Sequence, residues 1–243
     1  MTNDPTTRLT RPDGLIFDLD GTLADTVGAR IGGWVEVLSA EGFDTSGEQV
    51  GPMIGMDGKR LARAVAEASG RRLGEADAER VDKAAGAAFD QRNEAPRQLP
   101  GLADVLAAIE DLRLPWVIAT SSRREQVAAS VRALELHQDP EIVDGSQVEH
   151  AKPAPDLLLA AAERLGLPPA RCWAIGDSTW DVRAAVAAGM PAIGVTAGSA
   201  VRASDLEGAG AARVVSSLEE LAALLRELPP AGVPGGDARA GRP

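Results

Sequence analysis

Short apolar runs alternate along the chain with longer segments in which apolar residues recur at helical spacing. The apolar runs cover residues 15–17, 116–119, 172–175, 192–195 and 213–215. Short runs of this kind are typical of strands buried on both faces of a parallel sheet. Stripes of helical period run through residues 102–112, 157–165 and 218–228. This alternation predicts an α/β fold with a doubly wound parallel sheet.

One stretch breaks the alternation. Helical patterns occur there at 31–40, 59–69 and 75–91, with no convincing strand between them. The simplest interpretation is a small all-α insert after the first strand. We therefore expect an N-terminal tail (1–12), a core domain (13–26 and 95–228), a helical cap (27–94) and a disordered C-terminal tail (229–243) rich in Pro, Gly, Ala and Arg.

Composition narrows the classes of function. The 243 residues carry a formal net charge of -11 and no long basic run. Nucleic-acid binding is therefore not expected, because phosphate backbones require clustered Lys and Arg. The N-terminus lacks the apolar stretch of a signal peptide, and no segment approaches the length of a membrane span. These features favour a soluble, cytoplasmic protein.

Two carboxylates carry the first chemically informative motif. Asp18 and Asp20 follow the first apolar run and precede Gly21-Thr22. A strand that enters a glycine turn can bring both carboxylates to one centre. There, one could attack phosphorus and the other could handle the proton of the leaving group. The alternative without chemistry is a turn that merely ends a strand.

Polar groups that suit a phosphate follow later in the chain. Thr120 ends the second apolar run, and its hydroxyl, with Ser121 and the amides of a helix N-terminus, could donate to phosphate oxygens. Ser122 is assigned mainly to helix capping, with Glu125. Lys152 precedes a proline-rich turn, and its ammonium would offset phosphate and carboxylate charge.

The third buried run ends in a second acidic motif. Asp177 lies at the predicted end of this strand, and Asp181 lies one helical turn later. Ligands of parallel sheets bind at the carboxyl ends of the strands, so these groups should meet Asp18 and Asp20. Several carboxylates this close repel one another unless a cation binds, and Mg2+ prefers such oxygen ligands. Asp181 could instead be a charge partner for a helix N-terminus.

These motifs, in this order, resemble those of the haloacid dehalogenase (HAD) superfamily over residues 13–228. The all-α insert is similar to the small cap of the phosphoglycolate phosphatase and β-phosphoglucomutase branch. One departure is Ala151, where the family commonly has glycine before the lysine. The resemblance implies a Rossmann-like core and a Mg2+-dependent phosphatase that acts on a small phosphorylated metabolite.

The resemblance also implies a role for each motif residue. Asp18 would form an aspartyl-phosphate, and Asp20 would act as general acid and then as base. Thr120 and Lys152 would hold the phosphoryl group. The implied Mg2+ ligands are Asp18, the Asp20 carbonyl and Asp177, with Asp181 in support.

Rival functions remain within the same fold. A sugar phosphomutase of the β-phosphoglucomutase type tends to carry histidine at the position of Arg30 and Glu-Asp at the position of Gly176-Asp177. Both differences favour hydrolysis, although Arg30 could be an ordinary solvated helix residue. A non-catalytic HAD-fold binding protein would lack a nucleophile, acid or metal ligand, and none is missing here.

The substrate is not defined by these motifs. The glycine-rich segment 55–60 is a candidate substrate loop, and it carries the cations Lys59 and Arg60. An ordinary loop followed by a helix start is an equal alternative. Phosphoglycolate, sugar phosphates and nucleotides all remain open, and the pattern does not indicate an oligomeric state.

Overall fold

The computed structural model describes residues 9–122 and 124–229. Its central feature is a six-stranded parallel sheet with the strand order β5-β4-β1-β6-β7-β8. The strands are β1 (Gly14–Phe17), β4 (Trp116–Thr120), β5 (Ile142–Asp144), β6 (Cys172–Gly176), β7 (Ala192–Val195) and β8 (Arg213–Val215). Later strands are added on both sides of β1, so the winding direction changes there. Ligands bind at such switch points, beyond the carboxyl ends of the strands.

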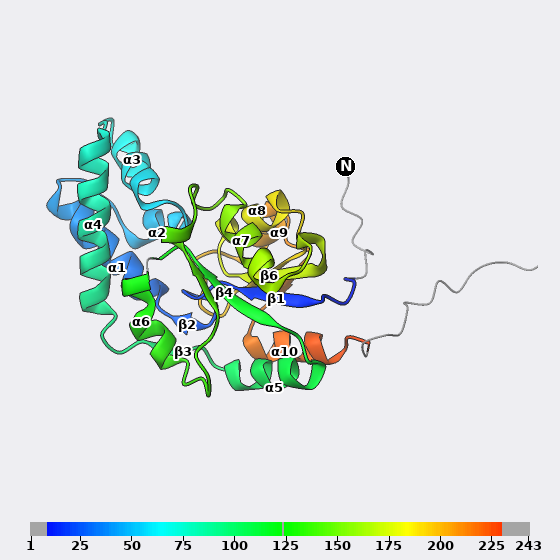
Figure 1. The fold of residues 1–243 in the computed structure, drawn as a ribbon. Coiled ribbons are helices and arrows are strands. Elements are labelled where there is room, and N and C mark those ends of the chain that lie inside the picture. Colours follow the sequence, from blue (N-terminus) through cyan, green and yellow to red (C-terminus); the bar gives the residue numbers. More distant parts are fainter. Residues whose placement is uncertain (1–8, 123, 230–243) are drawn as a thin grey trace, which may run out of the picture.

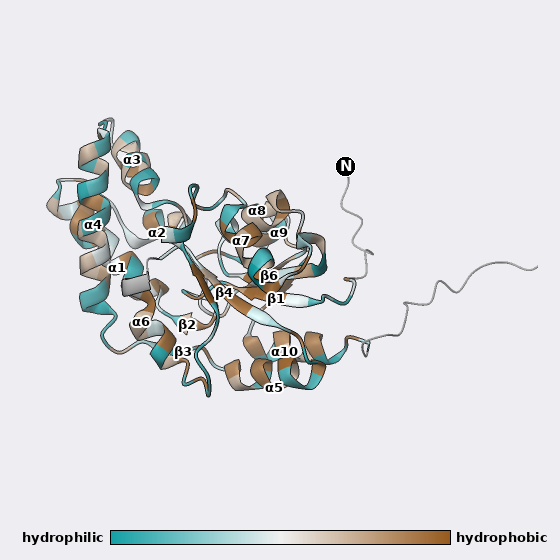
Figure 2. Ribbon diagram, viewed as in Figure 1, coloured by the Kyte–Doolittle hydropathy of each residue, from teal (hydrophilic) through white to brown (hydrophobic). Residues whose placement is uncertain are grey.

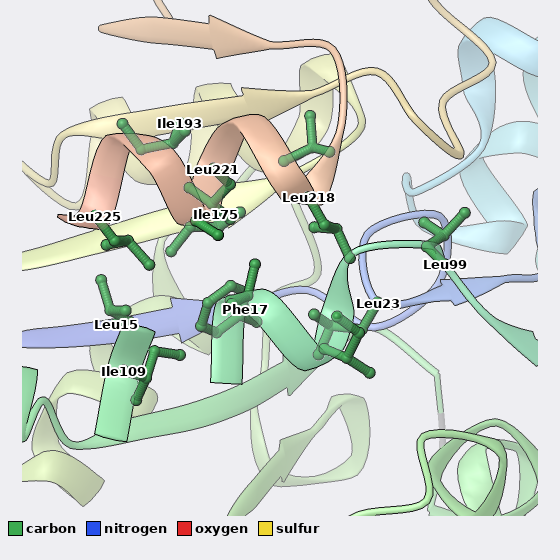
Figure 3. Close-up of a cluster of buried hydrophobic side chains, with 14 of the residues drawn as sticks. Leu15, Phe17, Leu23, Leu99, Ile109, Ile175, Ile193, Leu218, Leu221 and Leu225 are labelled. Carbon is green, nitrogen blue, oxygen red and sulfur yellow. The ribbon is translucent and has the colours of Figure 1, made fainter. Parts of the chain in front are cut away.

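Helices cover both faces of this sheet (Figure 1). On one face, α5 and α10 pack against Leu15 and Phe17 (Figure 3). On the other face, residues of α7, α8 and α9 pack with Ile16. Successive side chains of a strand point to opposite faces, so a single apolar run contributes to both layers. The core helices are α5 (Leu102–Leu112), α6 (Arg124–Ala133), α7 (Asp156–Leu165), α8 (Thr179–Ala187), α9 (Ala203–Ala209) and α10 (Leu218–Arg226).

Four helices follow the first strand and form the unit that we call the helical insert. They are α1 (Val27–Ala40), α2 (Gly47–Val50), α3 (Gly58–Ala68) and α4 (Glu75–Arg92). They share a hydrophobic cluster of their own, which includes Trp34, Leu38 and Leu61. At Gly33 the helices α1 and α4 come so close that a Cβ atom would lie 2.9 Å from the backbone nitrogen of Phe89.

Two short strands connect the helical insert to the sheet. β2 (Ala24–Asp25) and β3 (Arg97–Gln98) form an antiparallel pair at the two points where the chain crosses between these parts. The amide of Leu99 also donates to the carbonyl of Leu23 at 2.8 Å. The remaining short elements are the 3₁₀ helices η1 (Gly51–Met53), η2 (Gly145–Gln147) and η3 (Pro169–Arg171).

The predicted α/β class, with its doubly wound parallel sheet and all-α insert, is confirmed. The predicted runs correspond to five of the strands, whereas β2, β3 and β5 were not expected. The domain boundaries stay a prediction. Residues 1–8 and 230–243 lie outside the described residues, as does the side chain of Glu125 in the expected capping box with Ser122.

Hydropathy follows the layering of the fold. Figure 2 shows hydrophobic residues along the sheet and on the inner faces of α5 and α10, with hydrophilic residues spread over the outer faces of α3 and α4. In the described part of the chain, no helix combines the length and apolar character that a membrane crossing requires.

Candidate active site

The polar motifs meet at the carboxyl edge of the sheet. Asp18 follows β1, Thr120 ends β4 and Asp177 follows β6, so adjacent parallel strands place them side by side. Lys152 enters from the loop between η2 and α7. Asp18, Thr120 and Asp177 line one cavity of about 220 Å³, and Lys152 is bonded to Asp18 beside it.

Lys152 is buried between two carboxylates. Its Nζ atom lies 2.6 Å from Asp18 Oδ1 and 2.5 Å from Asp181 Oδ1, and its side chain is only 2% exposed. Burial alone would lower the pKa of this ammonium, but the charges of Asp18 and Asp181 raise it above its ordinary value. Lys152 therefore stays protonated and fixes the orientation of Asp18.

The acidic side chains around Lys152 carry more negative charge than this one ammonium can neutralise. Burial raises the pKa of Asp18 to about 7; Lys152 opposes this shift, whereas Asp181 adds to it. Burial, together with the like charges of Asp181 and Asp18, also raises the pKa of Asp177 well above its ordinary value. Buried carboxylates with raised pKa values gain stability from a bound cation.

Three of these carboxylates have the geometry of a metal site. Oxygen atoms of Asp18, Asp177 and Asp181 all lie within 4.8 Å of one another. Hard divalent cations prefer such oxygen ligands. The residues therefore fit a metal ion, which would supply the positive charge that Lys152 alone does not.

Gly21 makes room for this acidic cluster. Its φ is +84°, and an added Cβ atom would lie 2.4 Å from Asp177 Oδ2. Only glycine adopts such a φ at low cost while allowing the side chain of Asp177 to approach. The next residue, Thr22, donates its hydroxyl to Asp177 Oδ1 at 3.3 Å.

Asp20 is held by several donors, apart from the metal-type cluster. Its carboxylate accepts bonds from Thr26 Oγ1 at 2.7 Å, Arg30 Nη2 at 2.8 Å and Ser122 Oγ at 3.0 Å. Burial acts to raise the pKa of Asp20, but Arg30 and the two hydroxyl donors outweigh it and lower that pKa below its ordinary value. Asp20 is therefore ionised and fixed in direction.

The sequence analysis named Arg30 only as a difference from the phosphomutases and left open that it is an ordinary solvated helix residue; the structure places it in the site. Its guanidinium also donates to Ser122 Oγ at 2.8 Å and lies 3.8 Å from the centroid of the Phe89 ring, and its side chain is 16% exposed. It is thus not an ordinary solvated helix residue. A sequence signal existed, because Val27 and Trp34 lie three and four residues away on the same buried face of α1.

The hydroxyl side chains at the end of β4 have three different surroundings. Thr120 is buried, and its Oγ1 accepts the amide of Ser122 at 3.1 Å. Ser121 Oγ is buried with no hydrogen-bond partner among the described residues, and Ser121 lines the cavity. Ser122, which was assigned mainly to capping, donates its hydroxyl to Asp20.

Asp181 caps a helix and also faces the acidic cluster, so its position is compatible with both alternatives that the sequence left open, and its role as a metal ligand stays a prediction. Its Oδ2 accepts the amide and the hydroxyl of Ser178 at 3.0 and 2.5 Å, which closes a capping box at the start of α8. Its Oδ1 meets Lys152. The helix N-terminus therefore orients a carboxylate that also faces the acidic cluster.

The helical insert contributes part of the lining of the cavity. The residues concerned are Arg30, Trp34, the segment 54–58, Leu61, Asp82 and Gly86. Lys59 and Arg60 are not among the described residues that line the cavity. Lys59 pairs with Glu75 at 2.8 Å, and the guanidinium of Arg60 lies 5.5 Å from the Trp180 ring centroid. Their role as substrate contacts stays a prediction.

The fold and the site together define a doubly wound α/β protein with an acidic, lysine-containing centre at the carboxyl edge of its sheet. The chain belongs to the family of haloacid dehalogenase-like hydrolases, whose family model matches residues 12–189. It is therefore a hydrolase, as the sequence motifs predicted.

Curated relatives of the chain are phosphatases. The fructose-1-phosphate phosphatase YqaB of Escherichia coli is 33% identical over 75% of this chain and 95% of its own length. The phosphoglycolate phosphatase of Shigella boydii is 32% identical over 76% of this chain and 81% of its own length. The resemblance to this branch of the superfamily is confirmed.

Solved structures of similar fold support the assignment of the chain to this family. A hydrolase from Pseudomonas syringae has a TM-score of 0.80 and 33% identity, over 89% of this chain and 99% of that one. CbbY from Rhodobacter sphaeroides, solved in complex with phosphate, has a TM-score of 0.70 and 26% identity, over 86% and 96% of the two chains. The β-phosphoglucomutase of Clostridium difficile, 21% identical with a TM-score of 0.72 over 86% and 93%, shares the fold.

Proposed function

We propose that the protein is a Mg2+-dependent phosphatase that hydrolyses a small phosphate monoester through an aspartyl-phosphate on Asp18. One observation carries this proposal: Asp18 faces the cavity with Lys152 at 2.6 Å, beside an acidic cluster that fits a divalent cation. The phosphatase relatives support the same reaction. A cytoplasmic location and a cap formed by residues 27–94 belong to this proposal.

Asp18 is the nucleophile in this mechanism. Lys152 holds one oxygen of its carboxylate and thereby turns the group toward the cavity. Attack forms the bond from Asp18 to phosphorus and breaks the bond from phosphorus to the leaving oxygen. Thr120, Ser121 and Lys152 hold the oxygens of the phosphoryl group, and the unpartnered Ser121 hydroxyl is available as a donor.

Asp20 moves the protons. A bound phosphate dianion raises the pKa of this neighbouring carboxyl by like-charge repulsion, so Asp20 takes up the proton that it delivers to the leaving oxygen. It is then ionised again, and Thr26, Arg30 and Ser122 stabilise that form. In this state Asp20 removes a proton from a water molecule. The oxygen of that water bonds to phosphorus as the bond from phosphorus to Asp18 breaks, which releases inorganic phosphate and the free Asp18 carboxylate.

The carboxylates of Asp18, Asp177 and Asp181 and the carbonyl of Asp20 would hold Mg2+. When bound, Mg2+ neutralises charge on the transferring phosphoryl group and on its carboxylate neighbours. Closure of the helical insert excludes bulk water from the cavity.

Phosphate release from p-nitrophenyl phosphate and a panel of metabolite phosphates tests this function. Activity should require Mg2+, disappear with EDTA and disappear in Asp18→Asn. Asp25→Asn, at an exposed position a few residues further on, is the matched control and should retain activity. Release that survives EDTA or the Asp18→Asn change would contradict the mechanism. If no phosphate is released, interconversion of sugar phosphates is the next assay, because it detects a phosphomutase.

A further inference from the structure

Arg30 connects the helical insert to Asp20 and to the end of β4. It lies in the first turn of α1, and its Nη2 atom donates to Asp20 Oδ2 and to Ser122 Oγ, each at 2.8 Å. Ser122 Oγ in turn donates to the same Asp20 Oδ2 at 3.0 Å. Groups from three separate segments of the chain therefore form a closed triangle of hydrogen bonds around one carboxylate oxygen.

The guanidinium of Arg30 is itself held in place by α4. It lies 3.8 Å from the centroid of the Phe89 ring, and Phe89 is buried. A guanidinium is planar and stacks on an aromatic face, so its donors keep one direction, whereas the donors of a lysine ammonium rotate. Phe89 therefore supports the group that holds Asp20.

This triangle involves only one of the two carboxylate oxygens of Asp20. Each oxygen has about two lone pairs, and the donors Arg30 and Ser122 occupy those of Oδ2. Oδ1 accepts a hydrogen bond from one donor among the described residues, Thr26 Oγ1, at 2.7 Å. Oδ1 can therefore carry a proton and release it while the bonds at Oδ2 keep the carboxyl group in a fixed orientation.

From this geometry we infer that Arg30 is a positioning residue, which aligns Asp20 for proton transfer to the leaving oxygen of the substrate. In that step the proton passes from Asp20 to the leaving oxygen, and this oxygen keeps the electron pair of its broken bond to phosphorus. The inference rests on the proposed phosphatase function. It adds to that function a residue that acts through Asp20 and not on the substrate.

Two aryl phosphates of similar shape test this alignment. p-Nitrophenyl phosphate releases a stable phenolate that needs little protonation, whereas phenyl phosphate releases a more basic oxygen that depends on the acid. The ratio of their kcat/KM values, measured with purified protein and saturating Mg2+, therefore reports proton transfer to the leaving oxygen. Hydrolysis of the aspartyl-phosphate follows release of the leaving group and does not enter kcat/KM.

Arg30→Met removes the guanidinium and keeps the apolar stem. It should lower kcat/KM for phenyl phosphate at least about tenfold more than for p-nitrophenyl phosphate. Arg30→Lys restores a positive donor and should recover part of this loss. Phe89→Leu removes only the aromatic support and should cause a smaller loss of the same kind. Arg80→Met removes an exposed cation of the insert that pairs with Glu41, and as the control it should leave the ratio unchanged.

A double variant shows whether Arg30 acts through Asp20. Asp20→Asn keeps the shape of the side chain but cannot supply the proton, so it should reduce hydrolysis of phenyl phosphate more than that of p-nitrophenyl phosphate. Adding Arg30→Met to Asp20→Asn should then leave the ratio between the two substrates unchanged. A further selective loss in the double variant would overturn the inference, because Arg30 would then act by a route other than Asp20.

The outcomes separate this inference from the proposed function. An equal loss for both substrates in Arg30→Met would overturn the positioning role and leave the phosphatase function intact, because a purely structural defect lowers both rates alike. If circular dichroism shows that Arg30→Met does not fold, the same comparison in Arg30→Lys and Phe89→Leu decides. Absence of Mg2+-dependent hydrolysis of both esters by the unchanged protein would instead overturn the proposed function.

Discussion

Lys152 is the residue on which the charge balance of the site depends. Removing it by Lys152→Met leaves Asp18 and Asp181 buried without their common partner. Removing one partner of a buried ion pair costs about 3–5 kcal/mol, so we expect a comparable loss in the free energy of unfolding, measured in urea without metal. Lys59→Met removes an exposed partner of Glu75 and should change stability little. An unchanged free energy in Lys152→Met would contradict this account.

Substitution of Gly21 allows the effect of backbone strain to be distinguished from that of a steric clash. Gly21→Ala forces alanine to a φ of +84° and brings its Cβ atom to 2.4 Å from Asp177. Gly166→Ala imposes a similar strain, at a φ of +68°, with nothing within 4 Å of the new Cβ atom. Both should lose about 1–2 kcal/mol of stability from strain. Only Gly21→Ala should also weaken Mg2+ binding, as measured by metal titration, and equal Mg2+ affinity in the two variants would exclude the clash.

The acidic cluster predicts that the stability of the metal-free protein falls, rather than rises, as the pH increases. The pKa of Asp18 is raised to about 7 in the folded state, so the folded state binds more protons than the unfolded state between about pH 4 and 7. Stability should therefore fall as pH rises through this window. Exposed carboxylates with lowered pKa values, such as Asp13 and Asp205, titrate below it.

Thermal unfolding measured from pH 5 to 8, with and without Mg2+, checks this dependence. Tm should decrease with pH in EDTA, and the increase in Tm on adding Mg2+ should be largest near pH 8. Asp18→Asn should flatten the decrease. A Tm in EDTA that rises between pH 5 and 7 would show that other groups dominate.

At the scale of elements, Trp180 connects α8 to the helical insert. Its indole N–H donates to the Pro52 carbonyl in η1 at 3.1 Å, away from the two strands that join the insert to the sheet. One hydrogen bond contributes about 1 kcal/mol. Trp180→Phe should therefore raise KM by up to about tenfold, because fewer molecules hold the insert closed. Steady-state kinetics test this. Arg183→Gln, which removes a guanidinium 5.0 Å from the Trp180 ring centroid but keeps the indole, should have a smaller effect.

Strands and helices could be predicted wherever an apolar run was buried on both faces of the sheet or a stripe of apolar residues at helical spacing was long. β2 and β3, with two residues each, are too short to show a period, and only their pairing defines them. β5 was missed although β8, which has the same length, was predicted, and its pairing with β4 defines it. The strand-end positions of Asp18, Thr120 and Asp177 followed from the same runs. The contacts of Arg30 and Ser122 with Asp20 depend on how the insert packs on the sheet, and local sequence contains no measure of that.

At the scale of the molecule, the two parts of the site belong to different packing units. Asp18 and Asp177 follow strands of the sheet, whereas Arg30 and Asp82 lie on helices of the insert. Asp20 lies at the junction and is bonded to both parts, through Ser122 and Arg30. A displacement of the insert relative to the sheet would therefore change the surroundings of Asp20 through its bond to Arg30.

The central place of β1 in the sheet has a consequence for synthesis on the ribosome. Gly14 pairs with Cys172, and Leu15 pairs with Trp116. At a synthesis rate of about 5–20 residues per second, β4 is made roughly 5–20 s after β1, and β6 is made later still. Nascent chains that end before residue 172 should therefore be cleaved by protease near β1 while the helical insert resists, and protection at β1 would contradict this order. The strand that Asp18 follows is thus made first and enclosed late.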